Sequence, residues 1–223
     1  VTPPSLPAWD ASGNRLLQIM ISDYSFDTAS ETYYKMGRLQ RVVTAANVPE
    51  LNTDFMSLIA PGLKKHFGSA KKPMQLRIYM KEAPTMHTSA SKGASAAADI
   101  RLEFSVVSQT EDVDVDVEDS MARSVARYLG LVDDPAGSQV AFTLGGHASC
   151  ELSFDVVSAG SGQLLQAEIE KFDLGTWSVA SSAVGTVNLV DGLLNLVSKV
   201  IEDIGVPAIN AVLKKGMPLP SAK

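Results

Sequence analysis

The densest group of chemically capable side chains lies in residues 111–119, where six carboxylates fall within nine positions. Valines alternate with them, so an extended backbone would place Asp112, Asp114, Asp116 and Glu118 on one face. Carboxylate oxygens are ligands that calcium prefers, but the segment lacks the glycine and the terminal glutamate of an EF-hand loop. The pattern therefore favours a solvated acidic strand, with calcium-regulated membrane association as a weaker alternative.

His147, Ser149 and Cys150 lie close together in the sequence, which raises the question of nucleophilic catalysis. On a strand, His147 and Ser149 share the face opposite Cys150, so the three side chains do not converge. Cys150 falls among the apolar positions and is expected to be a buried, unreactive thiol. His66 and His87 are scattered, and the sequence has no nucleophile elbow, phosphate-binding loop, dinucleotide fingerprint or metalloprotease motif. We therefore expect no enzyme activity, no cofactor and no metal site.

A small basic cluster consists of Lys64, Lys65, His66, Lys71 and Lys72. Lysines in such a group can contact anionic lipid headgroups. A solvated helix end has the same composition, so the sequence leaves both interpretations open.

The charge balance excludes one class of partner. The 223 residues contain 19 basic and 25 acidic side chains, for a net charge of -6. Without the six carboxylates of residues 111–119, 19 acids balance 19 bases, so the acidity is confined to one segment. Nucleic-acid binding needs clustered positive charge, and we therefore expect no nucleic-acid partner. No run reaches the ~18 uninterrupted apolar residues of a membrane span.

The first residues predict a linker. Residues 1–14 are rich in proline and begin without Met, a basic leader or an apolar leader, which indicates a piece of a longer chain. A single cysteine, Cys150, permits no internal disulfide. That observation mildly favours a reducing compartment and does not exclude secretion.

Apolar spacing predicts three helical regions. Phe26, Ala29, Tyr33 and Met36 have helical spacing, with Asp23 as the expected cap. A second region follows Thr53, its expected cap, and Pro61 should divide it into two short pieces or kink it. The longest stripe spans residues 189–213, and Gly205 and Pro207 should bend that helix. Residues 120–132 are ambiguous and favour a short helix.

An apolar run predicts a strand over residues 15–22, and residues 39–44 are a further candidate. Period-two alternation predicts strands over residues 75–80, 98–106, 150–156 and 165–170. Turn residues at Gly145-Gly146 and at 160–162 separate the runs, and helices do not, so the sheet should be antiparallel. Each strand has one apolar face, and the long C-terminal helix needs an apolar surface to cover. The expected fold class is α+β: a long kinked C-terminal helix and shorter N-terminal helices packed against a strongly twisted antiparallel sheet.

Three segments together resemble a known family. Residues 23–28 (Asp-Tyr-Ser-Phe-Asp-Thr), continuing to Gly37, are similar to the opening helix of the C-terminal lobe in the BPI/LBP/CETP family. Residues 51–67 are similar to that lobe's second helical segment. Residues 213–220 resemble its terminal glycine-aromatic-Pro-Leu-Pro pattern, with Met217 in the aromatic position. The segments occur in the family's order and span nearly the whole chain.

The resemblance implies a tubular lipid-binding lobe over residues 15–223, with phospholipid acyl chains held in an apolar pocket between helices and sheet. It also implies an N-terminal lobe of the same parent chain, transient contact with a membrane surface, and secretion. In this family lipopolysaccharide recognition is mostly attributed to the other lobe. Residues 108–147 depart from the family's pattern and are interpreted as an insertion.

The helical stripes supply the expected lining of the pocket. The predicted lipid-binding residues are Phe26, Ala29, Tyr33, Leu58, Ile59, Leu63, Leu194, Val197, Ile201 and Ile204. Helical apolar stripes more often form plain core, which is the alternative for each of these residues. At the level of function, lipid carriage or transfer competes with a non-enzymatic interaction module that keeps the fold without a bound lipid.

Overall fold

The computed structural model describes residues 22–37, 39–89, 93–107, 138–159, 162–189 and 191–218. The helices are α1 (Asp23–Lys35), α2 (Thr53–Met56), α3 (Gly62–Phe67), α5 (Asp191–Val200), the π-helical η1 (Ile201–Gly205) and α6 (Val206–Leu213). The strands are β1 (Gln40–Thr44), β2 (Met74–Met80), β3 (Thr85–Ser89), β4 (Gly93–Val107), β5 (Ser138–Ala159), β6 (Gly162–Ser182) and β7 (Met217–Pro218).

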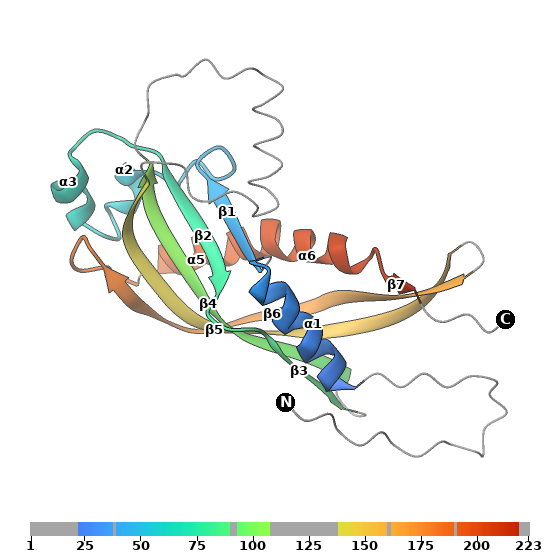
Figure 1. Ribbon diagram of the computed structural model, residues 1–223. Helices are drawn as coiled ribbons and strands as arrows, with labels where there is room; N and C mark the ends of the chain where they lie inside the picture. Colours follow the sequence, from blue (N-terminus) through green and yellow to red (C-terminus); the bar gives the residue numbers. More distant parts are fainter. Residues whose placement is uncertain are drawn as a thin grey trace, which may run out of the picture.

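These strands form one strongly curled sheet (Figure 1). Its order is β1-β2-β4-β5-β6-β7, and β3 pairs with the first part of β4. Every pairing among the described strands is antiparallel. The predicted α+β class with a twisted antiparallel sheet is therefore confirmed. β5 and β6 are long enough to extend well beyond the shorter strands, as an arm that carries α6 and β7 (Figure 1).

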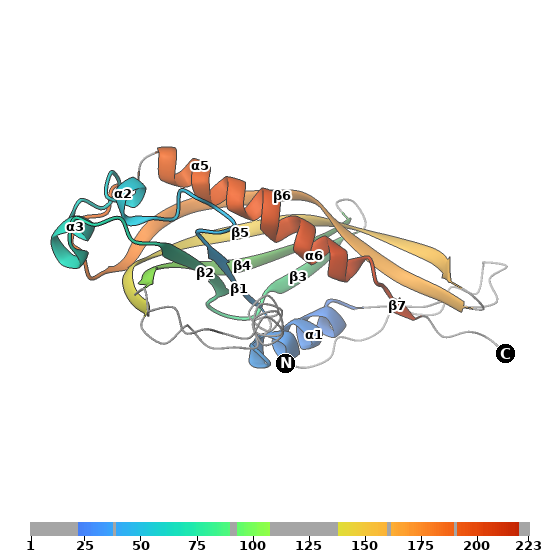
Figure 2. The ribbon, with the colours of Figure 1, turned by 90° about the horizontal axis from the view of Figure 1, so that it is seen from above.

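The main core lies between α2, α3 and α5 on one side and β1, β2 and the adjoining parts of β4 and β5 on the other. Phe104 of β4 and Phe142 of β5 are fully buried there, with their rings stacked at a centroid distance of 4.6 Å. Leu63 of α3 and Leu193 of α5 are also fully buried in the same cluster. Burial of such aliphatic and aromatic side chains contributes roughly 1.5–3 kcal/mol each. The remaining helices lie at the two edges: Figure 2 shows α6 beside β6 and α1 beside β3.

The C-terminal helix is continuous in space but changes its winding in the middle. α5 gives way to five π-helical residues, η1, before α6 begins at Val206. Gly205 and Pro207 stand at this junction, where the sequence predicted a bend. Proline cannot donate its backbone N–H and clashes with the preceding turn, which disfavours regular α-winding there.

Pro61 divides the second helical region into α2 and α3, as predicted. The expected cap was wrong by one residue. Asn52 caps α2, and its side-chain oxygen accepts hydrogen bonds from the backbone N–H groups of Asp54 and Phe55 at 3.1 and 3.0 Å. The Thr53 hydroxyl instead accepts from the backbone N–H of Lys72 at 2.9 Å. Because the Thr53 hydroxyl is engaged by the backbone at Lys72, Asn52 caps the helix instead.

The interpretation of Gly145-Gly146 as a turn was also wrong, because both residues lie in the middle of β5. A Cβ on Gly145 would lie 1.7 Å from Nη1 of Arg101, and one on Gly146 would lie 2.5 Å from the ring of Trp177. The two glycines therefore let an arginine and a tryptophan from neighbouring strands cross the backbone on opposite faces. Of the turn predicted at 160–162, residues 160 and 161 lie outside the described residues, and the residues that flank them, Ala159 and Gly162, pair with each other.

Several predicted features lie outside the described residues. They are the linker 1–14, most of the strand at 15–22, the acidic segment 111–119 and the helix at 120–132. Within the range interpreted as an insertion, residues 138–147 form the first part of β5.

Candidate functional site

The register of β4, β5 and β6 brings apolar side chains into rows on one face of the arm. Paired residues of an antiparallel sheet point to the same side. The rows are Ala98–Ala148–Leu174, Ala96–Cys150–Phe172 and Ala94–Leu152–Ile169, followed by the pair Phe154–Ala167. We call this set the distal apolar face. β4 contributes alanines, and β6 contributes three large side chains besides Ala167. Ala96, Cys150, Leu152 and Phe172 are only partly buried, whereas Ala94, Ala148 and Ile169 are buried.

The opposite face of the same strands is polar. Asp99 of β4 lies 3.1 Å from Nδ1 of His147 on β5, and both side chains are exposed. The Arg101 guanidinium lies over Gly145 on this side. The alternation therefore separates a wet face from an apolar one, as the sequence predicted.

Polar side chains fasten α1 to the free edge of β3. The Asp27 carboxylate accepts a hydrogen bond from the backbone N–H of Met86 at 2.9 Å, and the Asp23 carboxylate accepts from the N–H of Thr88 at 3.1 Å. Asp23 thus binds the sheet, and Ser22 occupies the cap position that was predicted for it. On the same face of the helix, the Ser30 hydroxyl donates to a backbone carbonyl at 2.6 Å.

This attachment leaves the apolar stripe of α1 largely uncovered. Phe26 contacts Phe154 of the distal apolar face, with ring centroids 5.5 Å apart. Farther along the stripe, Tyr33 is 49% exposed and Met36 is 57% exposed. No residue of α1 is fully buried. A partly exposed apolar helix face therefore adjoins a partly exposed apolar sheet face.

The ten predicted lining residues separate into three groups. Ile59, Leu63, Val197 and Ile201 are buried in the main core, and Ile204 packs against it. Phe26, Ala29 and Tyr33 lie on α1. Leu194 is half-buried on α5, and Leu58 is 75% exposed between α2 and α3.

Sequence reasoning missed the strand residues of the site. Phe154, Leu152 and the alanines of β4 carry the period-two signal, but the expected lining came from helices alone. Cys150 lies on the apolar side of its strand, as predicted, and is partly exposed. Burial raises the pKa of its thiol, and a backbone hydrogen bond with Ala96 opposes that shift to a smaller extent. The raised pKa keeps the thiol protonated and weakly nucleophilic.

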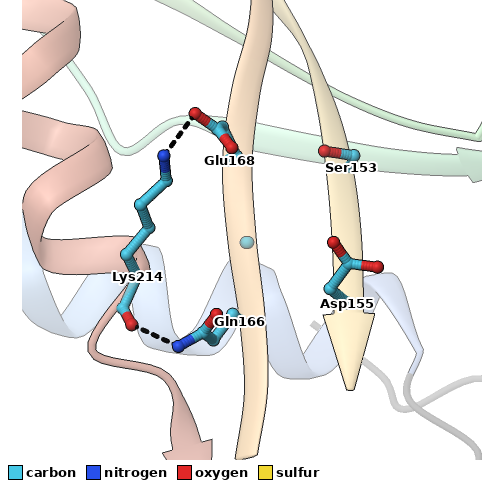
Figure 3. A pocket seen from close by; sticks show the side chains of 6 residues that line it. Ser153, Asp155, Gln166, Glu168 and Lys214 are labelled. Atoms are coloured by element: carbon cyan, nitrogen blue, oxygen red, sulfur yellow. Dashed lines mark hydrogen bonds and ion pairs between the residues drawn. The ribbon is translucent and has the colours of Figure 1, made fainter. Parts of the chain in front are cut away.

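A small polar hollow lies near the end of α6 (Figure 3). Its volume is about 30 Å³, which suits a water molecule and is far below the size of an acyl chain. Lys214 closes one side: its Nζ lies 2.6 Å from a carboxylate oxygen of Glu168, and its carbonyl accepts a hydrogen bond from Gln166 at 2.6 Å. Ser153 and Asp155 line it from β5, on the face opposite Phe154. None of the predicted lining residues borders this hollow.

The described part of the chain contains no group of three or more His, Cys, Asp or Glu side chains placed to hold a metal ion. The acidic segment 111–119 lies outside it. Among the described helices, none is long and apolar enough to cross a membrane.

The fold is thus a curled antiparallel sheet with helices on its apolar side and an apolar face left partly open. The model of the LBP / BPI / CETP family, C-terminal domain, matches residues 1–122, and the chain belongs to this family. Its members bind or transfer lipids and are not enzymes. The resemblance predicted from the sequence is thereby confirmed.

The fold is similar to that of a solved structure titled "Crystal structure of lipopolysaccharide binding protein", with a TM-score of 0.53 and 17% sequence identity. The match covers 84% of this chain and 35% of the other, so the chain spans about a third of that protein's length. No curated protein matches the sequence.

Proposed function

We propose that this lobe binds phospholipid by its acyl chains, on the distal apolar face beneath the stripe of α1, and carries or transfers the lipid. The observation that carries the proposal is the position of α1. Its contacts with β3 are polar, and they leave Tyr33 and the apolar rows around Cys150 partly exposed. An apolar ligand on these surfaces would remove both from water.

Burial of the acyl chains in the protein is strongly favourable relative to water, but it is nearly neutral relative to a bilayer. Each methylene removed from water contributes about 0.8 kcal/mol, and a bilayer offers the acyl chains almost the same gain. Transfer between membrane and protein is therefore close to balanced, and the protein's contribution is to shield the chains in water. Phe26, Ala29 and Tyr33 would line the open part, and Leu194 and Ile204 would contact the ligand from α5 and η1. Ile59, Leu63, Val197 and Ile201 would close the inner end.

The family also supports the proposals about context. LBP, BPI and CETP are secreted proteins, and we propose secretion for the parent chain. We further propose that an N-terminal lobe of that chain is a partner of this one, and that a membrane surface is a transient partner.

The experiment measures lipid in the purified lobe. Native mass spectrometry and solvent extraction should detect phospholipid bound to the wild-type chain. Ala96→Trp would fill the distal apolar face and should lower the amount bound by at least several-fold. Ala97→Trp is the matched control, because the next residue points to the polar face. Equal lipid in both variants would exclude this face as the site.

The interaction module remains the second candidate, because four of the predicted lining residues fill the core with side chains. The same measurement separates the two. Wild-type lobe that holds no phospholipid and takes up no fluorescent phospholipid would favour the interaction module.

A further inference from the structure

One end of the molecule carries a group of lysines. Residues 51–72, with α2 and α3, form this end in both views (Figures 1 and 2), and we call them the α2–α3 tip. The tip contains four lysines and one acid, Asp54, for a net charge of +3, whereas the whole chain carries -6. Six of the other carboxylates lie in residues 111–119, outside the described residues, so the residues outside both segments carry -3.

The tip also holds an apolar side chain out into water. Leu58 is 75% exposed, whereas the next two residues, Ile59 and Ala60, are buried. The turn that carries Leu58 is anchored on its inner side. The Ile59 carbonyl accepts a hydrogen bond from the backbone N–H of Asn188 at 2.9 Å. The buried residues after Leu58 and this hydrogen bond hold the backbone in a position that leaves the Leu58 side chain exposed.

Close packing at Gly62 also holds this turn against the loop that follows β6. A Cβ at Gly62 would lie 1.7 Å from the backbone carbonyl oxygen of Val184, so only glycine allows the approach. Val184 itself is buried. The loop after β6 thus supports the tip from beneath and keeps Leu58 pointing outward.

The same segment carries the four lysines. Lys64 on α3 pairs with Asp54 on α2 at 3.2 Å, which ties the two helices together. Lys65 and Lys71 are exposed, and Lys72 is half-buried. Long lysine side chains can reach headgroups while their stems lie on apolar surface.

We propose that the α2–α3 tip docks on an anionic lipid surface, with Leu58 entering the acyl boundary and Lys65, Lys71 and Lys72 contacting the headgroups. This inference rests on the proposed function, because a carrier must meet a lipid surface to load and unload. Charge complementarity selects the occupant. A peptide would need a groove or a strand edge to bind, whereas Leu58 is the exposed large apolar side chain of the tip and most of the other exposed side chains are charged or polar.

The test is sedimentation with vesicles of phosphatidylcholine alone and of phosphatidylcholine mixed with phosphatidylglycerol. The charge variant combines Lys65→Gln, Lys71→Gln and Lys72→Gln and leaves the Lys64–Asp54 pair intact. Its matched control combines the exposed Lys81→Gln, Lys199→Gln and Lys215→Gln, so that both triples lower the net charge equally. We expect the tip triple to bind the anionic vesicles on the order of 100-fold more weakly at low salt, about fivefold per lysine. The control triple should bind nearly as the wild type does.

The apolar contribution has its own pair of variants. Leu58→Ala should weaken binding roughly tenfold. The control is Ile209→Ala, which removes the same number of carbon atoms from a residue 42% exposed on α6 and should not weaken binding. Equal loss in the two triples would overturn the proposal, because net charge alone would then explain binding. Wild-type chain that binds neither vesicle would also overturn it and would direct attention to an acidic polypeptide partner.

Extraction of bound lipid from the same variants separates this inference from the proposed function. Tip variants that lose vesicle binding but keep bound phospholipid support both. Wild type that docks on vesicles through the tip but carries no lipid would refute carriage and leave the docking surface standing. Wild type that carries phospholipid, together with tip variants that bind vesicles as well as the wild type does, would refute the docking proposal and leave lipid carriage standing.

Discussion

The side-chain amide of Asn210 binds both backbone groups of Ile169. Its Oδ1 accepts a hydrogen bond from the Ile169 N–H at 2.8 Å, and its Nδ2 donates to the Ile169 carbonyl at 3.3 Å. α6 thereby takes the place of a neighbouring strand at one position of the β6 edge. A few residues later, β7 pairs with Leu164 and Leu165 of the same edge.

Asn210→Asp should destabilise the lobe by about 1–3 kcal/mol, because the carboxylate keeps the acceptor, loses the donor and faces the Ile169 carbonyl. Urea unfolding measures the change. Asn195→Asp, at an exposed position of α5, is the control and should change stability by less than about 0.5 kcal/mol. Equal effects of the two substitutions would show that the amide pair contributes nothing specific.

Asp27→Ala should loosen α1, since it removes the acceptor of the Met86 N–H and α1 has no fully buried side chain to compensate. We expect faster hydrogen exchange at Met86, by on the order of 10-fold, for a bond to a charged group that contributes about 1.5–3 kcal/mol. Glu31→Ala removes another acid from the same helix, one paired with Lys35 in solvent, and should leave the Met86 amide unchanged. Unchanged exchange in Asp27→Ala would mean that α1 is held by other contacts.

The sequence predicted α1 and its apolar stripe but not the way α1 is held. Helical spacing of Phe26, Ala29 and Tyr33 normally marks the buried face. In the structure, Asp23 and Asp27 bind backbone groups of β3 from about 60 positions away. Phe26 therefore meets Phe154 of the sheet, whereas Tyr33 and Met36 stay exposed. Local periodicity contains no information about which distant N–H groups a carboxylate will meet.

The same limit explains the two glycines of β5. A glycine pair is typical of a turn, and only the cross-strand neighbours Arg101 and Trp177 show why it lies within a strand. Strand alternation succeeded elsewhere because it depends on the two faces of the sheet alone. The distal apolar face could have been predicted from it, had the lining been sought on strands as well as helices.

Gly146→Ala should destabilise the lobe by about 1–3 kcal/mol, because the new methyl group would overlap a rigid indole ring. Gly145→Ala should cost less than about 1 kcal/mol, since the clashing Arg101 guanidinium ends a flexible side chain. Unfolding is followed by Trp177 fluorescence in a Trp9→Phe background. A greater loss in Gly145→Ala would contradict the assignment of the two faces.

Cys150 gives a prediction about pH. Burial raises the pKa of its thiol in the folded lobe above the ordinary value of about 8.5. The unfolded chain therefore loses the thiol proton first, so this contribution to stability is complete below about pH 8.5 and is lost as pH rises through the folded pKa. The stability difference between wild type and Cys150→Ala should be constant below that pH and shift against the wild type above it. A difference that stays constant into the alkaline range would refute the shift.

The Cys150 thiol also reports on the proposed lipid site. Alkylation should be slower in the folded lobe than in urea, and slower still while lipid covers the distal apolar face. Removal of lipid by detergent exchange should raise the rate. An alkylation rate that is independent of lipid content would place the lipid elsewhere.

The hydrogen bonds between Asn210 and Ile169 also determine when the β6 edge can be completed during synthesis of the chain. Asn210 follows Ile169 by 41 positions, so a ribosome that adds 5–20 residues per second makes it roughly 2–8 s later. During that interval β5 and β6 can already form their hairpin, but the outer backbone groups of β6 still lack their partner. The last step of sheet assembly therefore waits for the end of the chain. A nascent lobe whose synthesis stalls within α5 would expose unpaired backbone groups of β6 to chaperones and to other chains.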